Sequence, residues 1–160
     1  MTIISNDPLS SNEAVFNHST TGFNLPIIGH ATSTSIAALD DGNFVIFYKT
    51  SEGLRDLHGA IIDPQGTVLV PNLEVRTSND NQLHHDSPEV LNLAHDKFIM
   101  LYDSWNYAKN PGYEIFGQIF DYDGTKINDS FIVNHQSIGD QYNGSISELT
   151  DGSLAISWYS

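Results

Sequence analysis

The chain has 160 residues but no cysteine, only 6 basic residues and no long apolar run. Without cysteine no disulfide framework supports the fold, so a hydrophobic core must do so. The first residues lack the basic region and apolar core of a secretory signal peptide, and no stretch approaches the roughly 18 apolar residues of a membrane span. We therefore expect one domain over residues 1–160 that does not insert into a membrane. If the protein is exported, we expect another route or the earlier removal of a leader.

Positive charge is scarce compared with negative charge. The 20 acidic and 6 basic residues give a formal net charge of -14. Such a surface repels phosphate groups, which argues against nucleic acid and anionic membranes as partners. Cations are the natural counterpart of this charge, although solubility alone also accounts for it.

Two short stretches resemble one another at a constant offset of 58. They are GAIIDPQG (59–66) and GQIFDYDG (117–124). The similarity continues in the apolar segments IAALDDGNFVIFY (36–48), VLNLAHDKFIMLY (90–102) and ISELTDGSLAISWY (146–159). Self-similarity at a period of about 50 residues indicates a repeat architecture.

The repeats divide the chain into three units. The first two are residues 35–76 and 88–134, and the third begins at 145–160. Because residues 2–18 resemble 118–135 at an offset of 117, we expect N-terminal strands to complete the third unit and hide its edge. A segment of a longer repeat array is the alternative.

Apolar residues follow a period of two or short β-branched and aromatic bursts, which predicts an all-β fold. Asp and Gly between the bursts predict tight turns. Each unit is then a four-stranded antiparallel sheet resembling a propeller blade. The expected strands are 35–39, 43–49, 57–62, 68–75, 88–93, 97–103, 113–120, 126–133, 145–149, 153–159, 2–5 and 13–17.

Three such units are fewer than the 4 to 8 blades of closed propellers. A homodimer would complete a ring of six blades, and homodimers with twofold symmetry are the commonest oligomers. The alternatives are a monomer of three sheets and a slice of a larger propeller.

Two segments carry a family resemblance. They are YEIFGQIFDYDG (113–124) and the succession of F-x-V-N, G-D-Q and S-x-x-x-L-x-D-G within 131–158. The pattern resembles the degenerate repeats of large secreted bacterial surface proteins and RTX-type adhesins. The resemblance implies an extracellular or cell-surface location, adhesion or ligand recognition, and calcium-rich surroundings. The chain lacks the glycine-rich nonapeptides that bind calcium in RTX proteins, which argues against that route of ligation.

Acidic residues around the second repeated turn suggest a calcium site. Asp121, Asp123 and Asp129 lie close together in sequence, and calcium takes 6 to 8 oxygen ligands. An EF-hand is excluded, because Thr125 and Ile132 occupy its fifth and twelfth positions. The alternative is a turn capped by aspartate.

The segment DSWNYAKNPGYE (103–114) combines aromatic and polar residues, and we expect it to be a loop. Aromatic faces stack on sugar rings while carboxylates and amides bind hydroxyl groups, so this segment predicts a site for a glycan or cell-surface ligand. The alternative is that its aromatics pack against a neighbouring unit or a homodimer interface. The candidate ligand-binding residues are Asp103, Trp105, Asn106, Tyr107, Asn110 and Tyr113.

Catalysis has less support in the sequence. There is no cysteine nucleophile, no G-x-S-x-G elbow and no phosphate-binding glycine loop. Carboxylates paired across units remain possible for a glycosidase, with Asp103, Glu114 and Glu148 as the first to test. We therefore expect a non-enzymatic extracellular binding or adhesion module of lectin type. The alternatives are a structural or oligomerising module and a glycoside hydrolase-like enzyme.

Overall fold

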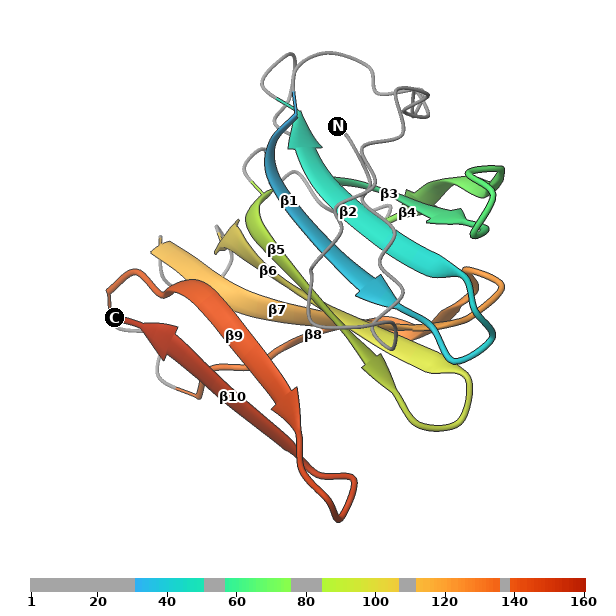
Figure 1. The fold of residues 1–160 in the computed structure, drawn as a ribbon. Helices are drawn as coiled ribbons and strands as arrows, with labels where there is room; N and C mark the ends of the chain where they lie inside the picture. The colour runs from blue at the N-terminus through green and yellow to red at the C-terminus, as the bar shows by residue number, and fades with distance from the viewer. Residues whose placement is uncertain (1–30, 51–56, 76–84, 107–111, 136–138) are drawn as a thin grey trace, which may run out of the picture.

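The computed structural model describes residues 31–50, 57–75, 85–106, 112–135 and 139–160. These residues form ten β-strands in three antiparallel sheets, with no helix among them (Figure 1). The all-β prediction is confirmed. Sheet A contains β1 (Ala31–Ala38), β2 (Phe44–Thr50), β3 (Leu57–Ile62) and β4 (Val68–Glu74); sheet B contains β5 (His85–Leu93), β6 (Lys97–Asn106), β7 (Gly112–Asp121) and β8 (Lys126–Ile132); sheet C contains β9 (Tyr142–Glu148) and β10 (Leu154–Tyr159).

Sheet B lies between the other two sheets (Figure 1). The first strand of each sheet makes the contact, since β1 packs against β5 and β5 packs against β9. Within the described ranges no helix is long and apolar enough to span a membrane.

The second strand of sheet B has apolar side chains on both faces, and both faces are covered. On one face Phe98 and Met100 of β6 pack with Phe47 of sheet A. On the other face Ile99 of β6 packs with Ile146 of sheet C. Complete burial of each such side chain contributes about 1.5–3 kcal/mol. The continuous apolar run of β6 therefore holds the three sheets together.

Four hairpin turns share one geometry. In each, a glycine with φ between 81° and 89° donates its N–H to the carbonyl three residues earlier, over 2.9–3.0 Å. A positive φ is unstrained for glycine, which explains the Asp and Gly pattern of these turns. The turn predictions are confirmed. The four glycines are Gly42, Gly66, Gly124 and Gly152.

The repeat is also visible in the third strands. The pairing of β3 with β4 shifts register between Gly59 and Ile61, and that of β7 with β8 shifts between Gly117 and Ile119. At each glycine an aromatic ring occupies the space of the absent side chain: Phe47 in sheet A and Phe131 in sheet B. The pairing is therefore interrupted after the equivalent glycine in both sheets, while the ring that fills the space comes from β2 in sheet A and from β8 in sheet B.

Two strands of sheet B are longer than the sequence-based expectation. β6 ends at Asn106 instead of residue 103, and β7 begins at Gly112 instead of residue 113. The ladder continues because Trp105 pairs with Tyr113 and Asn106 with Gly112. The expected loop is therefore shorter, and residues 107–111 lie outside the described residues. Polar and aromatic residues that follow an apolar run resemble a loop in sequence, which explains the difference.

The third sheet contains two strands within the described part of the chain. The predicted strands 2–5 and 13–17 lie outside the described residues. Over the ranges that the structure describes, the three sheets are open and form no closed ring. The propeller therefore remains a prediction.

Candidate functional site

Two carboxyl groups face one another where β5 begins and β6 ends. Asp86 of β5 and Asp103 of β6 are direct cross-strand partners. Residues directly opposite on antiparallel strands have Cβ atoms about 4.5–5.5 Å apart and share one face of the sheet. The two side chains are therefore neighbours although their positions in the sequence differ by 17.

Asp103 is 1% exposed. Its Oδ2 accepts the backbone N–H of Asn143 over 3.1 Å, whereas its Oδ1 has no hydrogen-bond partner among the described residues. Burial, together with the nearby charge of Asp86, raises the pKa of Asp103 to about 6. A carboxyl group with this pKa exchanges a proton near neutral pH, as acid–base catalysts do.

Asp86 has different surroundings. Its side chain is 42% exposed and forms an ion pair with the Lys49 ammonium group of sheet A. Asp86 Oδ1 also accepts the backbone N–H of Ser87 over 2.9 Å. The pair thus consists of an accessible carboxylate bound to a cation and a buried carboxyl that readily holds a proton.

A bulge lies beside the pair in two different sheets. In β5, Ser87 and Pro88 together oppose the single residue Tyr102, and in β9, Asn143 and Gly144 together oppose Trp158. We call Ser87–Pro88 and Asn143–Gly144 the bulge dipeptides. Bulges redirect side chains and are frequent beside active sites.

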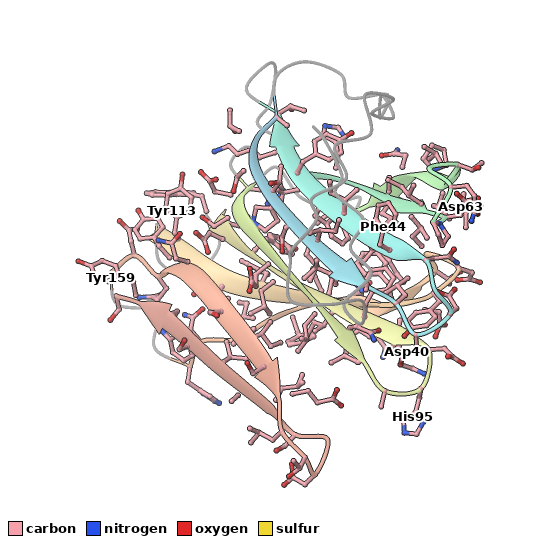
Figure 2. All side chains as sticks on the ribbon, in the orientation of Figure 1. Asp40, Phe44, Asp63, His95, Tyr113 and Tyr159 are labelled. Carbon is pink, nitrogen blue, oxygen red and sulfur yellow. The ribbon has the colours of Figure 1, made fainter. Side chains whose placement is uncertain are left out.

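Three aromatic side chains adjoin the carboxyl pair. Trp105 and Tyr113 are cross-strand partners whose ring centroids lie 5.2 Å apart at an interplanar angle of 87°. Tyr113 also contacts Tyr142 of sheet C, with centroids 4.9 Å apart. All three rings are partly exposed. Tyr113 lies toward the same end of the molecule as Tyr159, opposite the end with Asp40 (Figure 2).

Asp140 borders the aromatic group. Its Oδ1 accepts the backbone N–H of Tyr113 over 3.0 Å. Partial burial, followed by the hydrogen bond and charge of Asp140, raises the pKa of Tyr142. The Tyr142 hydroxyl therefore stays protonated and can donate a hydrogen bond.

Residues of the F-x-V-N and G-D-Q patterns hold the chain before β9 against β7. Asn134 accepts the backbone N–H of Ile115 over 2.9 Å and donates to Gln141 over 3.0 Å. Gln141 in turn donates its backbone N–H to Tyr113 over 2.9 Å. These buried amides have a structural role, because they fix Tyr113 and Asp140 relative to one another.

The structure brings Asp103, Trp105 and Tyr113 of the predicted ligand site together. Asn106 is the last residue of β6, opposite Gly112. Tyr107 and Asn110 lie outside the described residues. The prediction that aromatics of this segment pack against a neighbouring unit also applies, since Tyr113 touches sheet C.

The other two carboxylates suggested for a glycosidase lie elsewhere. Glu114 is buried and pairs with Ser104, one position from Asp103, so it lies on the opposite face of sheet B. Glu148 is at the far end of β9, opposite Leu154. Neither joins Asp103, whose carboxyl partner is Asp86.

The suggested calcium ligands are divided between a turn and a strand. Asp121 is the last residue of β7, Asp123 belongs to the turn that follows, and Asp129 is exposed on β8. The Asp123 carboxylate accepts the backbone N–H of Thr125 over 2.8 Å, and this hydrogen bond lowers its pKa. Among the residues that the structure describes, no three His, Cys, Asp or Glu side chains converge as metal ligands.

Sequence reasoning missed Asp86, Ser87, Tyr142 and Asn143. The repeat alignment contained a usable signal, because Ser87 lies three residues before Val90 and Asn143 three residues before Ile146. Polar residues at the same distance before the aligned apolar residues Val90 and Ile146 indicate a bulge that the two units share. Only the folded arrangement shows that both bulges reach Asp103.

Comparison with known proteins adds a fold relationship. No protein-family model matches the chain, and no curated protein matches it significantly. Among solved structures, the endo-arabinase from Bacteroides thetaiotaomicron VPI-5482 is similar, with a TM-score of 0.55 and 16% sequence identity. The match covers 81% of this chain and 51% of the endo-arabinase, so the chain spans about half the length of that enzyme.

This similarity corrects the expectation of a non-enzymatic binding or adhesion module. This similar structure is that of an endo-arabinase and not of an adhesin. At 16% identity the likeness establishes the shared fold alone. The glycoside hydrolase-like alternative is the interpretation that it favours.

Proposed function

We propose that the chain is part of a glycoside hydrolase that cleaves a neutral polysaccharide of the arabinan type. Asp86 is the carboxylate that faces the substrate, and Asp103 is its proton-holding partner. One observation carries the proposal: two carboxyl groups are direct neighbours in β5 and β6 but lie in contrasting surroundings. Contrasting surroundings of this kind separate the acid role from the base role in glycosidases. The fold shared with an endo-arabinase supports the class of enzyme.

Cleavage of a glycosidic bond requires a proton for the leaving oxygen and a carboxylate near the sugar. Asp103 Oδ1 has no hydrogen-bond partner among the described residues, so a proton needs a bridging water to leave it. In our proposal one water carries a proton from Asp103 to Asp86, and Asp86 passes it to the leaving oxygen. Water adds to the sugar carbon, and the proton that this water releases restores the pair. Asp103 therefore acts through Asp86 and does not touch the substrate.

The surroundings of the pair favour a neutral glycan. The partly exposed rings of Trp105, Tyr113 and Tyr142 offer surfaces for the apolar faces of sugars. Asp86, together with the exposed Asp140, gives the site negative charge, which repels uronic acids and sulfated sugars. An uncharged chain such as arabinan meets no such repulsion.

The test is hydrolysis of a panel of neutral and acidic polysaccharides, including linear arabinan, followed by the release of reducing ends. We expect release from arabinan and a loss of at least about 100-fold in Asp86→Asn and in Asp103→Asn, because general acid–base groups contribute about 10²–10⁴-fold. Asp129→Asn, an exposed change on β8, is the matched control. No release from any glycan of the panel contradicts the proposal, as does full activity in Asp86→Asn.

The proposal includes a finer description of the architecture. We infer that sheets A and B are propeller blades and that sheet C is the inner half of a third. The contact of successive first strands supports this inference. Two copies of the chain would supply six such sheets. We therefore expect light scattering to give a molar mass in solution that is twice the mass of one chain. An extracellular or cell-surface location suits an enzyme whose substrate is a polysaccharide.

A further inference from the structure

The bulge dipeptides contain two residues with an uncommon backbone conformation. Ser87 has φ 48° and Asn143 has φ 54°, in the left-handed region that side chains other than glycine rarely adopt. Such a conformation costs on the order of 1–3 kcal/mol and persists only where surrounding contacts enforce it. Both residues lie at equivalent positions of their repeat units and flank the same carboxyl group.

The two residues are bonded to each other across the boundary between sheets B and C. The Ser87 hydroxyl donates to Asn143 Oδ1 over 3.1 Å, which links β5 to β9. The backbone N–H of Asn143 donates to Asp103 Oδ2. Ser87 also interacts through its side chain with the Asp103 carboxyl. Asp103, Ser87 and Asn143 therefore form a closed set of polar contacts.

The hydrogen bonds distinguish the two oxygen atoms of Asp103. Oδ2 accepts a hydrogen bond from the backbone N–H of Asn143. Oδ1 is buried and receives no hydrogen bond from the described residues. A buried charged oxygen without a partner is costly, and a proton on Oδ1 lowers that cost by removing the negative charge.

We propose that Ser87 and Asn143 are positioning residues that clasp β5 to β9 and present one N–H group to Asp103 Oδ2, so that Oδ1 is the oxygen that carries the proton. A role for these residues in catalysis rests on the proposed function. The clasp itself, which sets how strongly Asp103 binds a proton, does not depend on any substrate. The other ionisable groups that influence Asp103 are Asp86, with its partner Lys49, and Tyr142.

The experiment is a ¹³C NMR titration of the Asp103 carboxyl group in the wild-type chain and in variants. Ser87→Ala removes the hydroxyl, and Asn143→Ala disfavours the left-handed conformation that delivers the N–H group. The Asn143 N–H group donates to Asp103 Oδ2, and the Ser87 hydroxyl donates its one hydrogen to Asn143 Oδ1 and so holds Asn143 in place. A hydrogen bond to a carboxylate lowers its pKa, so we expect both variants to raise the Asp103 pKa by roughly half a unit to one unit. Asn143→Gly keeps the N–H group and tolerates the conformation, so a smaller shift is expected and folding is preserved.

Asn128→Ala is the matched control. Asn128 has φ 59° on β8, so the change imposes the same backbone strain away from Asp103. An unchanged Asp103 pKa in both Ser87→Ala and Asn143→Ala overturns the clasp, as does an equal shift in Asn128→Ala. The titration needs no substrate, so it tests the clasp independently of hydrolysis. If the variants shift the Asp103 pKa but the chain hydrolyses no glycan, the clasp is supported and the proposed function is wrong.

Discussion

At the scale of single residues, Asp103 makes the stability of the fold depend on pH. Its pKa is 3.8 in an ordinary environment and about 6 in the folded chain. Between these values the folded chain binds more protons than the unfolded chain. The free energy of unfolding therefore falls as pH rises from about 4 to about 6, and the lost stability does not return at higher pH.

We predict that Asp103→Asn removes this dependence. The free energy of unfolding of the variant minus that of the wild-type chain should rise by about 2 kcal/mol between pH 4 and pH 7.5. Each unit of pKa difference is worth about 1.4 kcal/mol. Urea unfolding at both pH values measures the difference. Asp129→Asn, which alters an exposed carboxylate, should show no comparable gain. If the free energy of unfolding changes equally with pH in Asp103→Asn and in the wild-type chain, folding does not raise the pKa of Asp103.

The sequence revealed Asp103 as a candidate but not its partner. Asp86 follows two histidines in a polar stretch, where nothing in the local pattern marks a strand. Its pairing with Asp103 depends on the register of β5 against β6, which the bulge at Ser87 shifts. A register shift has no reliable signature in one sequence, because it is set by packing between distant segments.

At the scale of strands and turns, the repeated glycines predict unequal effects of the same mutation. A Cβ at Gly59 would lie 2.5 Å from the Phe47 ring, which is fully buried. A Cβ at Gly117 would lie 2.7 Å from the Phe131 ring, which is 42% exposed. Only the exposed ring has room to move away.

Gly59→Ala should therefore destabilise the fold by about 1–3 kcal/mol, the usual cost of overpacking a core. Gly117→Ala should cost clearly less. Chemical denaturation of both variants gives the comparison, and each serves as the control for the other. Equal losses would mean that Phe47 adapts as easily as Phe131.

Most elements of sheets A and B follow from the sequence. Their turns carry Asp and Gly, and their second strands are apolar bursts such as that of β6, so pattern alone predicted them. The part of β6 beyond Asp103 was not predicted, because Trp105 and Asn106 are amphipathic or polar. Asp103 is held by Asn143 of sheet C and Trp105 packs against Tyr113 of β7, and local composition reveals neither contact.

At the scale of the whole molecule, sheets A and B are joined at opposite ends. The Lys49–Asp86 ion pair lies beside the candidate site. At the other end, the Tyr122 hydroxyl accepts the backbone N–H of Asp40 over 3.1 Å and donates to Asn92. Asn92 completes the group by donating to the Asp40 carboxylate over 2.9 Å.

We predict that Tyr122→Phe lowers the free energy of unfolding by about 1–2 kcal/mol, because the hydroxyl loses one hydrogen bond to Asp40 of sheet A and one to Asn92 of sheet B. Thermal unfolding at pH 7 measures the loss. Tyr159→Phe is the control, since Tyr159 is 70% exposed and its change should stay within about 0.5 kcal/mol. A Tyr122→Phe variant as stable as this control would mean that the contact contributes nothing to the packing of the sheets.

The meeting of three sheets at Asp103 has a consequence for how alike the units can be. Sheet A supplies Lys49, sheet B supplies Asp86 and Asp103, and sheet C supplies Asn143. Lys49 of sheet A and Asp103 of sheet B occupy the same position of their units, because residues 36–48 align with 90–102. One unit thus contributes a cation and the next a carboxyl group from that shared position. The proposed site therefore depends on the differences between the units, which a row of identical copies would not provide.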